Sequence, residues 1–383
     1  AIYVLDASRA VGVVSTLLSE TESKPYVAGI QADYEKVREA HLKSEASKKR
    51  ITLAQARANS FKTDWKKEKP VKPRMLGTTA FQSWELADLA AHIDWTPFFQ
   101  TWELSGRYPA ILKDNKVGVE ATKLLHDARA MLDRIVKEKW LTAKGVAGFW
   151  PANAEGDDIV VFTDETRMSE LTRLHTLRQQ IAREPGRQRP HMALADFIAP
   201  RASTVPDYIG AFAVTTGIGE EEALSRHIKP TDDYGRIMLK ALADRLAEAF
   251  AEALHARVRK TLWGYANAER LTYEELIAEK YQGIRPAPGY PAQPDHTEKA
   301  TIFRLLDAER VTGIKLTESF AMWPGAAVSG LYFAHAESTY FGVGRIERDQ
   351  VEDYARRKGW SLAEAERWLT LVLNYEPHRM TPI

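Results

Sequence analysis

The stretch Arg285-Pro286-Ala287-Pro288-Gly289-Tyr290-Pro291 can form neither a helix nor a central strand. Each proline restricts φ and removes a backbone donor, and the glycine favours a left-handed conformation. We therefore expect a stiff, shaped loop. Arg285 supplies a permanent cation and Tyr290 an aromatic face with a hydroxyl, so the loop could hold an anionic or planar ligand. A purely structural proline loop is the alternative, and these residues alone leave both open.

Upstream of this loop, residues 234–263 predict the longest helix of the chain, with one apolar stripe along it. Asp244, Glu248 and Glu252 follow one another at i,i+4 steps, so their carboxylates line one side of the helix. Three like charges in a row repel one another, which favours a solvated face. A cation-binding face is the alternative.

Downstream of the loop, residues 297–311 predict a helix that ends before Gly313. Residues 319–333 place glycine and other small residues between aromatic side chains. Small residues let two backbones approach closely, so this segment suits a strand beside a bound ligand. Residues 340–344 predict a further strand.

Further out, strands and helices alternate along the chain. Buried strands are predicted at residues 145–150, 158–162 and 208–214, and helices at residues 120–139 and 166–184. The strand at 208–214 leads into Gly217-Ile218-Gly219 and three glutamates, which imitates a nucleotide-binding turn. The third glycine is missing, and the glutamates would repel a phosphate, so we interpret this piece as an acidic helix start.

Asp94 lies between a short helical pattern and Trp95-Thr96-Pro97. Aspartate before Thr-Pro commonly caps a helix or forms an Asx turn. The alternative is a buried carboxylate that pairs with a cationic group of a ligand.

The N-terminal residues 1–23 predict a buried strand, a turn and a helix, as at the end of a doubly wound α/β domain. A single βα unit cannot bury its own faces. We therefore expect residues 1–23 to be the tail of a domain whose remainder lies upstream, and the chain, which begins without methionine, to be a fragment. A helical and basic linker is expected at residues 24–71 and a folded domain at residues 72–383.

The formal net charge of +1 hides one basic stretch. From Lys36 to Arg74 there are thirteen Lys and Arg against four Asp and Glu, a local charge of +9 that leaves −8 for the rest of the chain. A solvated linker is the favoured interpretation, and a docking strip for an acidic partner is the alternative. The strip lacks interleaved aromatic residues over most of its length, so we expect no nucleic-acid partner.

Composition excludes several classes of site. The chain has no cysteine, which excludes disulfides, thiolate metal sites and cysteine nucleophiles. Its ten histidines are scattered without ligand spacing, so no metal site is expected. No apolar run approaches the roughly 18 residues of a membrane span, and no basic-then-apolar leader is visible. We expect a cytoplasmic protein with no membrane partner.

Five stretches together resemble a known family. They are ASRAVGVV from Ala7, DWTPFF from Asp94, KALADRLAEAFAEALHARVRK from Lys240, YQGIRPAPGYP from Tyr281 and LTESFAMWPGAAVSG from Leu316. In this order they are similar to the reactivation domain of cobalamin-dependent methionine synthase, which binds S-adenosylmethionine (AdoMet). The resemblance implies an α+β fold with helices around a twisted, mainly antiparallel sheet. It also identifies residues 1–23 as the last strand and helix of the family's cobalamin-binding domain.

The resemblance implies a role in repair. In the family, cob(I)alamin occasionally oxidises to inert cob(II)alamin, and AdoMet with one electron from flavodoxin or an equivalent flavoprotein restores methylcobalamin. The cobalamin would be held by the upstream domain of the same full-length chain, and zinc would be needed only by the homocysteine module, which is absent here. We expect the fragment to bind AdoMet but not to turn over alone.

Six residues match the family's AdoMet contacts: Asp94, Glu248, Arg285, Ala287, Tyr290 and Tyr340. Arg285 suits the AdoMet carboxylate, and Asp94 and Glu248 suit its ammonium and sulfonium regions. The tyrosines can pack against adenine or ribose, and Ala287 offers backbone groups. No catalytic residue is expected, because methyl transfer from a sulfonium requires alignment rather than a general base.

One residue departs from the family pattern: Gln293 stands where members often have cysteine. It flanks the loop, so we expect AdoMet binding to survive. Two other functions stay open. A regulatory AdoMet-sensing and flavoprotein-docking module is the first, and a free-standing methyltransferase, disfavoured by the missing glycine-rich AdoMet loop, is the second. Whether Glu220 and Asp244 touch the cobalamin domain is also open.

Overall fold

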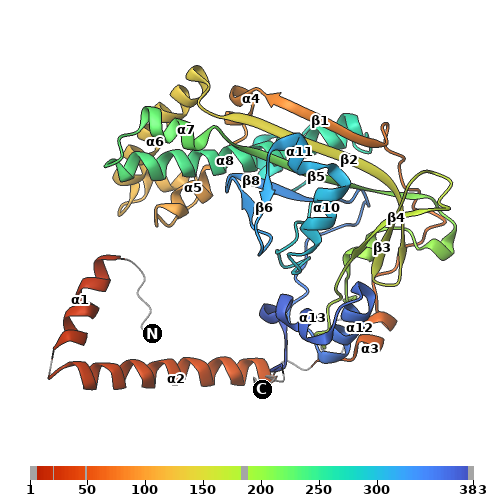
Figure 1. Ribbon diagram of the computed structural model, residues 1–383, viewed down its shortest axis with the longest axis horizontal. Coiled ribbons are helices and arrows are strands. Elements are labelled where there is room, and N and C mark those ends of the chain that lie inside the picture. The colour runs from red at the N-terminus through yellow and green to blue at the C-terminus, as the bar shows by residue number, and fades with distance from the viewer. Residues whose placement is uncertain (1–6, 20, 48–49, 183–188, 378–383) are drawn as a thin grey trace. The chain divides into compact units, whose positions relative to one another are not determined.

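The described part of the chain, in a computed structural model, comprises residues 7–19, 21–47, 50–182 and 189–377 (Figure 1). It divides into two compact units, Ala1–Ile51 with Ile181–Gln188, and Thr52–Gln180 with Arg189–Ile383. The first unit contains helices α1 (Ala7–Leu18) and α2 (Ser23–Ser47), as the sequence predicts. The strand predicted at residues 1–5 lies outside the described residues.

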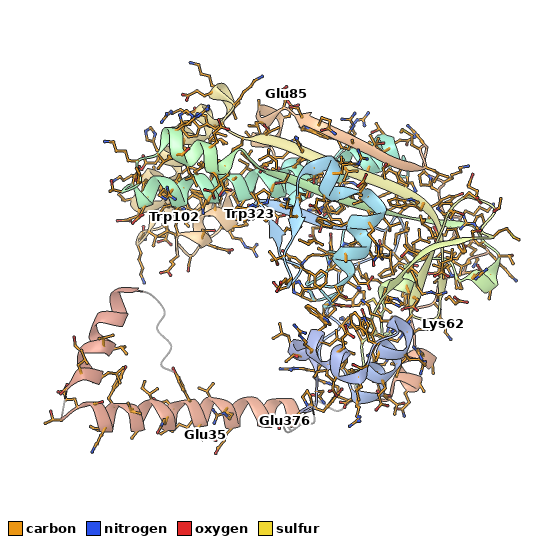
Figure 2. The ribbon with its side chains drawn as sticks, viewed as in Figure 1. Glu35, Lys62, Glu85, Trp102, Trp323 and Glu376 are labelled. Atoms are coloured by element: carbon orange, nitrogen blue, oxygen red, sulfur yellow. The ribbon has the colours of Figure 1, made fainter. Side chains whose placement is uncertain are left out.

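The second unit is built on one large sheet. Its strands are β1 (Gly77–Trp84), β2 (Thr142–Glu155), β3 (Asp158–Phe162), β4 (Glu170–His175), β5 (Asp207–Ile218) and β8 (Ala327–Tyr332). The order β4-β3-β2-β5-β8, with β1 also paired to β2, has antiparallel pairing throughout. A separate antiparallel pair joins β6 (Lys315–Leu316) and β7 (Met322–Trp323), where Figure 2 labels Trp323. The predicted antiparallel sheet is confirmed.

The central strands of this sheet are buried on both faces, and their alternate residues point to opposite sides. On β5, Phe212 and Val214 belong to one apolar cluster, and Ala211 and Ala213 belong to the other. Helices complete each cluster, so the sheet lies between two helical layers (Figure 1). The predicted α+β fold is confirmed.

Several helices cover the first face. The main ones are α4 (Leu86–Ala90), α5 (Trp95–Thr101), α6 (Gly118–Glu138) and α8 (Asp233–Arg257). The side chain of Asp232 caps α8 by accepting from the backbone N–H of Gly235 at 2.8 Å. A π-helical turn at Val258–Leu262 extends α8 to the predicted end of the long helix.

The second face is covered by helices from the C-terminal half. They are α10 (Glu298–Leu306), α11 (Ala308–Thr312), α12 (Arg348–Lys358) and α13 (Leu362–Trp368). The predicted helix at 297–311 is thus divided at Asp307, whose φ of 50° is left-handed. Two shorter helices are α7 (Glu220–His227) and α9 (Tyr273–Ile277). As expected, α7 begins after Gly219 with three glutamates in its first turn.

Two sequence predictions of secondary structure are wrong. The helix predicted at 166–184 does not form: residues 170–175 are strand β4, which a turn at residues 163–169 folds back onto β3. The strand predicted at 340–344 is a loop, in which the Val343 N–H donates to the Pro291 carbonyl at 2.8 Å. In both cases the partner available in the fold decides the conformation, which a local pattern cannot report.

The second unit begins at Thr52, within the segment expected to be a linker. Helix α3 (Leu53–Ala58) has a capping box between Thr52 and Gln55, and Leu53 is buried. Arg57 pairs with Asp157 at 2.8 Å and Asp353 at 2.7 Å. The interpretation of the basic stretch as a solvated linker therefore does not hold for Arg57.

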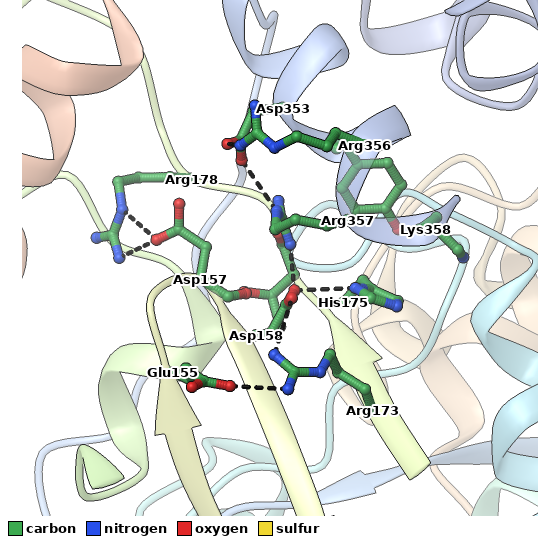
Figure 3. A network of polar contacts seen from close by, with 12 residues as sticks. Glu155, Asp157, Asp158, Arg173, His175, Arg178, Asp353, Arg356, Arg357 and Lys358 are labelled. Atoms are coloured by element: carbon green, nitrogen blue, oxygen red, sulfur yellow. Dashed lines mark hydrogen bonds and ion pairs between the residues drawn. The ribbon is translucent and has the colours of Figure 1, made fainter. Parts of the chain in front are cut away.

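A network of buried charges joins the β3–β4 hairpin to α12 (Figure 3). Arg357 of α12 contacts Asp158, and its Nε donates to Asp353 at 2.9 Å. Asp158 also accepts from His175 at 3.0 Å. These charges are paired on several sides, as buried ions must be. Among the described helices, none is long and apolar enough to cross a membrane.

Candidate functional site

The proline loop lies beside β8, held by backbone hydrogen bonds. Ile284 and Phe333 form a bridge, and the Leu331 N–H donates to the Pro286 carbonyl at 2.9 Å. Gly330 makes this approach possible, because a Cβ there would come within 2.7 Å of the Pro286 oxygen. The small residue Gly330, within the segment 319–333, thus lets the loop approach β8 closely.

Within the loop, the backbone turns tightly at Gly289, which has a φ of 94°. The Gly289 N–H donates to the Gln293 carbonyl at 2.7 Å, and the Tyr290 N–H donates to the Ala287 carbonyl at 3.2 Å. The predicted stiff, shaped loop is confirmed.

The loop forms one wall of a cavity of about 520 Å³. Five of the six predicted ligand residues line it: Glu248, Arg285, Ala287, Tyr290 and Tyr340. The sixth, Asp94, lines a neighbouring cavity of about 310 Å³, which shares Glu248, Glu279 and Arg285 with the first. Residues from α5, α8, the proline loop and the 340 loop are therefore brought to one place.

Asp94 combines the two roles considered for it. Its Oδ1 accepts from the Thr96 N–H at 2.9 Å, so it is the N-cap of α5, as predicted. The residue is half-buried and also faces the smaller cavity. Capping uses only part of the carboxylate's capacity to accept, and the rest remains for another donor.

Arg285 is held on several sides. Its Nη2 pairs with Glu252 Oε2 at 2.7 Å, and its Nη1 donates to the Tyr281 hydroxyl at 2.7 Å. Its backbone N–H donates to the Tyr340 hydroxyl at 3.0 Å, so two of the predicted ligand residues contact each other directly. Burial acts to lower the pKa of Arg285, but Glu252 and the neighbouring tyrosine hydroxyls together outweigh burial and raise the pKa, so the cation is permanent.

The acidic side of α8 is not a solvated face at Glu248 and Glu252, contrary to the favoured prediction, whereas Asp244 is about half exposed. The side chain of Glu252 is 16% exposed, and Glu248 is half-buried against the cavity. Burial raises the pKa of Glu248, with Arg245 opposing and Asp244 adding to that shift. A carboxylate whose charged form lacks full solvation favours a cationic neighbour, which agrees with the alternative prediction of a cation-binding face.

Sequence reasoning missed four residues that belong to the site: Glu252 as a partner of Arg285, His255, Glu279 and Tyr281. The signal for His255 was its spacing. Glu248, Glu252 and His255 lie at steps of four and three residues, which places them on one face of α8. Glu279 and Tyr281 gave no such signal, because they follow α9 in a turn.

Three other residues that were singled out lie outside the cavity lining. Gln293 is 2% exposed, and its side-chain amide donates to the His175 carbonyl at 2.6 Å. This hydrogen bond anchors the end of the loop to β4, outside the cavity. Glu220 lies 3.9 Å from Lys240, and Asp244, about half exposed, contacts Arg245. Among the described residues, no three His, Asp or Glu side chains gather as a metal site.

Comparison with known proteins identifies the family. The family model described as "Vitamin B12 dependent methionine synthase, activation domain" matches residues 85–359. The chain belongs to this family. The matched residues include those that line the two cavities and all strands of the large sheet except β1.

A solved structure agrees with this assignment. The structure titled "Crystal Structure of the MetH Reactivation Domain bound to AdoHcy" is 55% identical in sequence, with a TM-score of 0.82. The match covers 85% of this chain and 99% of that chain. The activation domain of methionine synthase, recognised from five sequence stretches, is confirmed.

Proposed function

We propose that this activation domain binds AdoMet in the 520 Å³ cavity and supplies its methyl group to restore oxidised cobalamin in methionine synthase. The observation that carries the proposal is the convergence of the six matched residues on two adjoining cavities. The solved reactivation domain described above holds AdoHcy, which is AdoMet without the transferred methyl group.

The chemistry of the cavity fits AdoMet. Arg285 offers a fixed cation for the carboxylate, and Glu248 offers an anion for the ammonium or sulfonium. Tyr290 is 62% exposed and Tyr340 38% exposed, so both rings have a free face for adenine or ribose. The loop is already ordered by its own hydrogen bonds, so little conformational entropy is lost on binding.

The protein's contribution to methyl transfer is positioning. The methyl group leaves the sulfonium, whose sulfur keeps the bonding electron pair, and AdoHcy remains. Cobalamin, which another domain of the full-length chain would hold, would supply the reduced cobalt as the methyl acceptor. A loop that holds the sulfonium in one direction and excludes water is what this transfer requires.

We also propose how this chain fits into the full-length protein. Residues 1–23 would be the end of the cobalamin-binding domain, and residues 24–71, which include α3, would be the connection to the domain at 72–383. Zinc would belong only to a homocysteine module elsewhere in the full-length protein. The chain would act in the cytoplasm and would not turn over alone.

Flavodoxin or an equivalent flavoprotein is the proposed electron donor, with the basic stretch as its docking strip. Lys62, labelled in Figure 2, and Lys66, Lys67 and Lys69 are exposed. Exposed charge pairs are screened over about 10 Å at 0.1 M salt, so docking should weaken as salt rises. Docking that is insensitive to salt would argue against this strip.

Titration calorimetry with AdoMet tests the main proposal. The wild-type chain should bind, and Arg285→Ala should bind much more weakly, because the change removes the cation opposite the carboxylate. Arg226→Ala, at an exposed arginine of α7, is the matched control and should bind as the wild type does. An isolated chain that does not bind AdoMet would refute the proposal.

A further inference from the structure

One face of α8 and its π-helical turn carries Glu248, Glu252, His255 and Arg259 at steps of four, three and four residues. His255 and Arg259 are fully buried. Two of the four, Glu252 and His255, contact Arg285. The donors that these contacts leave free determine how Arg285 can receive a ligand.

The guanidinium of Arg285 has five N–H groups: two on Nη1, two on Nη2 and one on Nε. Nη1 donates to the Tyr281 hydroxyl at 2.7 Å and to His255 Nδ1 at 3.1 Å, which uses both of its hydrogens. Nη2 forms an ion pair with Glu252 Oε2 at 2.7 Å. The hydrogen of Nε has no hydrogen-bond partner among the described residues, and Nε and Nη2 form the edge of the group that does not include Nη1.

His255 can serve as an acceptor because it is neutral. Burial lowers its pKa well below the usual value, and the cations Arg285 and Arg259 lower the pKa further. With Nδ1 accepting from Arg285, the proton of the ring lies on Nε2, which is 3.4 Å from the Tyr265 hydroxyl. The ring stacks on Tyr332 at a centroid distance of 5.1 Å, so its orientation is fixed.

We propose that His255 is a positioning residue for Arg285. Together with Tyr281 it occupies Nη1, so the Nε–Nη2 edge is left to bind the ligand's carboxylate side-on. Without His255, Nη1 would have a free hydrogen and the guanidinium could rotate between edges. This inference rests on the proposed binding of AdoMet. It adds that His255 determines which edge of the Arg285 guanidinium meets the ligand.

The test compares two ligands in calorimetry of the full chain: AdoMet and decarboxylated AdoMet, which lacks only the carboxylate. His255→Phe keeps an aromatic ring but removes the acceptor, and His255→Asn places an amide oxygen near the position of Nδ1. Tyr281→Phe removes the other partner of Nη1 and keeps the aromatic ring. His227→Phe, at a histidine of α7 outside the cavity lining, is the matched control.

We expect the wild-type chain to prefer AdoMet over the decarboxylated ligand. His255→Phe and Tyr281→Phe should each reduce that preference about tenfold, because each removes a hydrogen bond to a charged group. His255→Asn and His227→Phe should keep the wild-type preference. Equal weakening of both ligands would show a purely structural role and overturn the inference. An unchanged preference in both Phe variants would overturn it as well. A wild-type chain that binds neither ligand would instead overturn the proposed function, and the inference with it.

Discussion

Gly330 on β8 lies directly against the carbonyl oxygen of Pro286, and a Cβ at this glycine would approach that oxygen to 2.7 Å. The proline loop can therefore reach its hydrogen bond with Leu331 only because residue 330 has no side chain. This contact sets the position of the wall that carries Arg285, Ala287 and Tyr290.

Gly330→Ala should destabilise the fold by about 1–3 kcal/mol, because the added methyl group must displace the loop or the strand. AdoMet affinity should fall as well, since the displaced loop carries Arg285. Urea unfolding and calorimetry measure the two effects. The control is Gly325→Ala, where an added Cβ has no atom within 4 Å. Equal effects of the two changes would contradict the role of Gly330.

Glu248 predicts a pH dependence of ligand binding. Burial raises its pKa, so a larger share of this carboxyl is protonated in mild acid than for an exposed glutamate. A bound cation favours the ionised form, and AdoMet affinity should therefore fall as the pH falls through the raised pKa.

Glu248→Gln should weaken AdoMet binding at pH 7 by about tenfold and flatten the pH profile. Calorimetry between pH 5 and pH 8 gives both quantities. Glu222→Gln, at an exposed glutamate of α7, should leave the profile unchanged. A variant at Glu248 that retains the wild-type profile would exclude this carboxyl as its source.

Asp207 predicts a pH dependence of stability. It is 6% exposed and accepts from the backbone N–H groups of Ala199 at 2.8 Å and Tyr208 at 2.7 Å. Burial outweighs these hydrogen bonds and raises its pKa to about 7. The unfolded chain ionises this aspartate near pH 4, so the stability contributed by the protonated form is lost as the pH rises from about 4 to about 7.

The comparison with Asp207→Asn isolates this group. The free energy of unfolding of the wild type minus that of the variant should decline between pH 4 and pH 7 and then level off. Urea unfolding at several pH values measures the difference. A difference that stays constant or rises with pH would contradict the raised pKa.

Arg357 and Arg356 of α12 both contact Asp353, but in different surroundings (Figure 3). The side chain of Arg357 is 12% exposed and also contacts Asp158, whereas that of Arg356 is 72% exposed. Arg357→Met should cost about 1.5–3 kcal/mol, the range for a lost hydrogen bond to a charged group, because it removes one buried partner from both Asp158 and Asp353. Arg356→Met should cost about 1 kcal/mol or less. Urea unfolding measures the loss of unfolding free energy in each variant. Equal losses would show that burial does not determine the contribution of these arginines.

Predictions from the sequence were correct where the deciding interactions are local along the chain, and wrong where they come from residues distant in sequence. Asp94 was predicted as a helix cap and is one, because a cap is made with a residue two positions away. The apolar stripe of α8 was predicted because periodicity shows which face is buried. Strand β4 was missed because β3, its partner, decides its conformation.

The acidic side of α8 shows the same limit at the level of charge. Asp244, Glu248 and Glu252 look alike in sequence, at equal spacing. In the fold, Asp244 is about half exposed, Glu248 lines the cavity and Glu252 pairs with Arg285. Their different roles follow from what packs against each one, and a pattern of like charges does not contain that information.

The amino-acid sequence by itself determined the stiffness of Arg285–Pro291 and, through five matching stretches, the family. Both follow from residues whose effect is local or whose identity is read directly. Only the tertiary structure decided that this loop rests on Gly330, that α5 and α8 meet it at one cavity, and that Glu252, His255 and Tyr281 hold its arginine. These contacts join residues far apart in the chain, so they form only when the sheet and its two helical layers pack together.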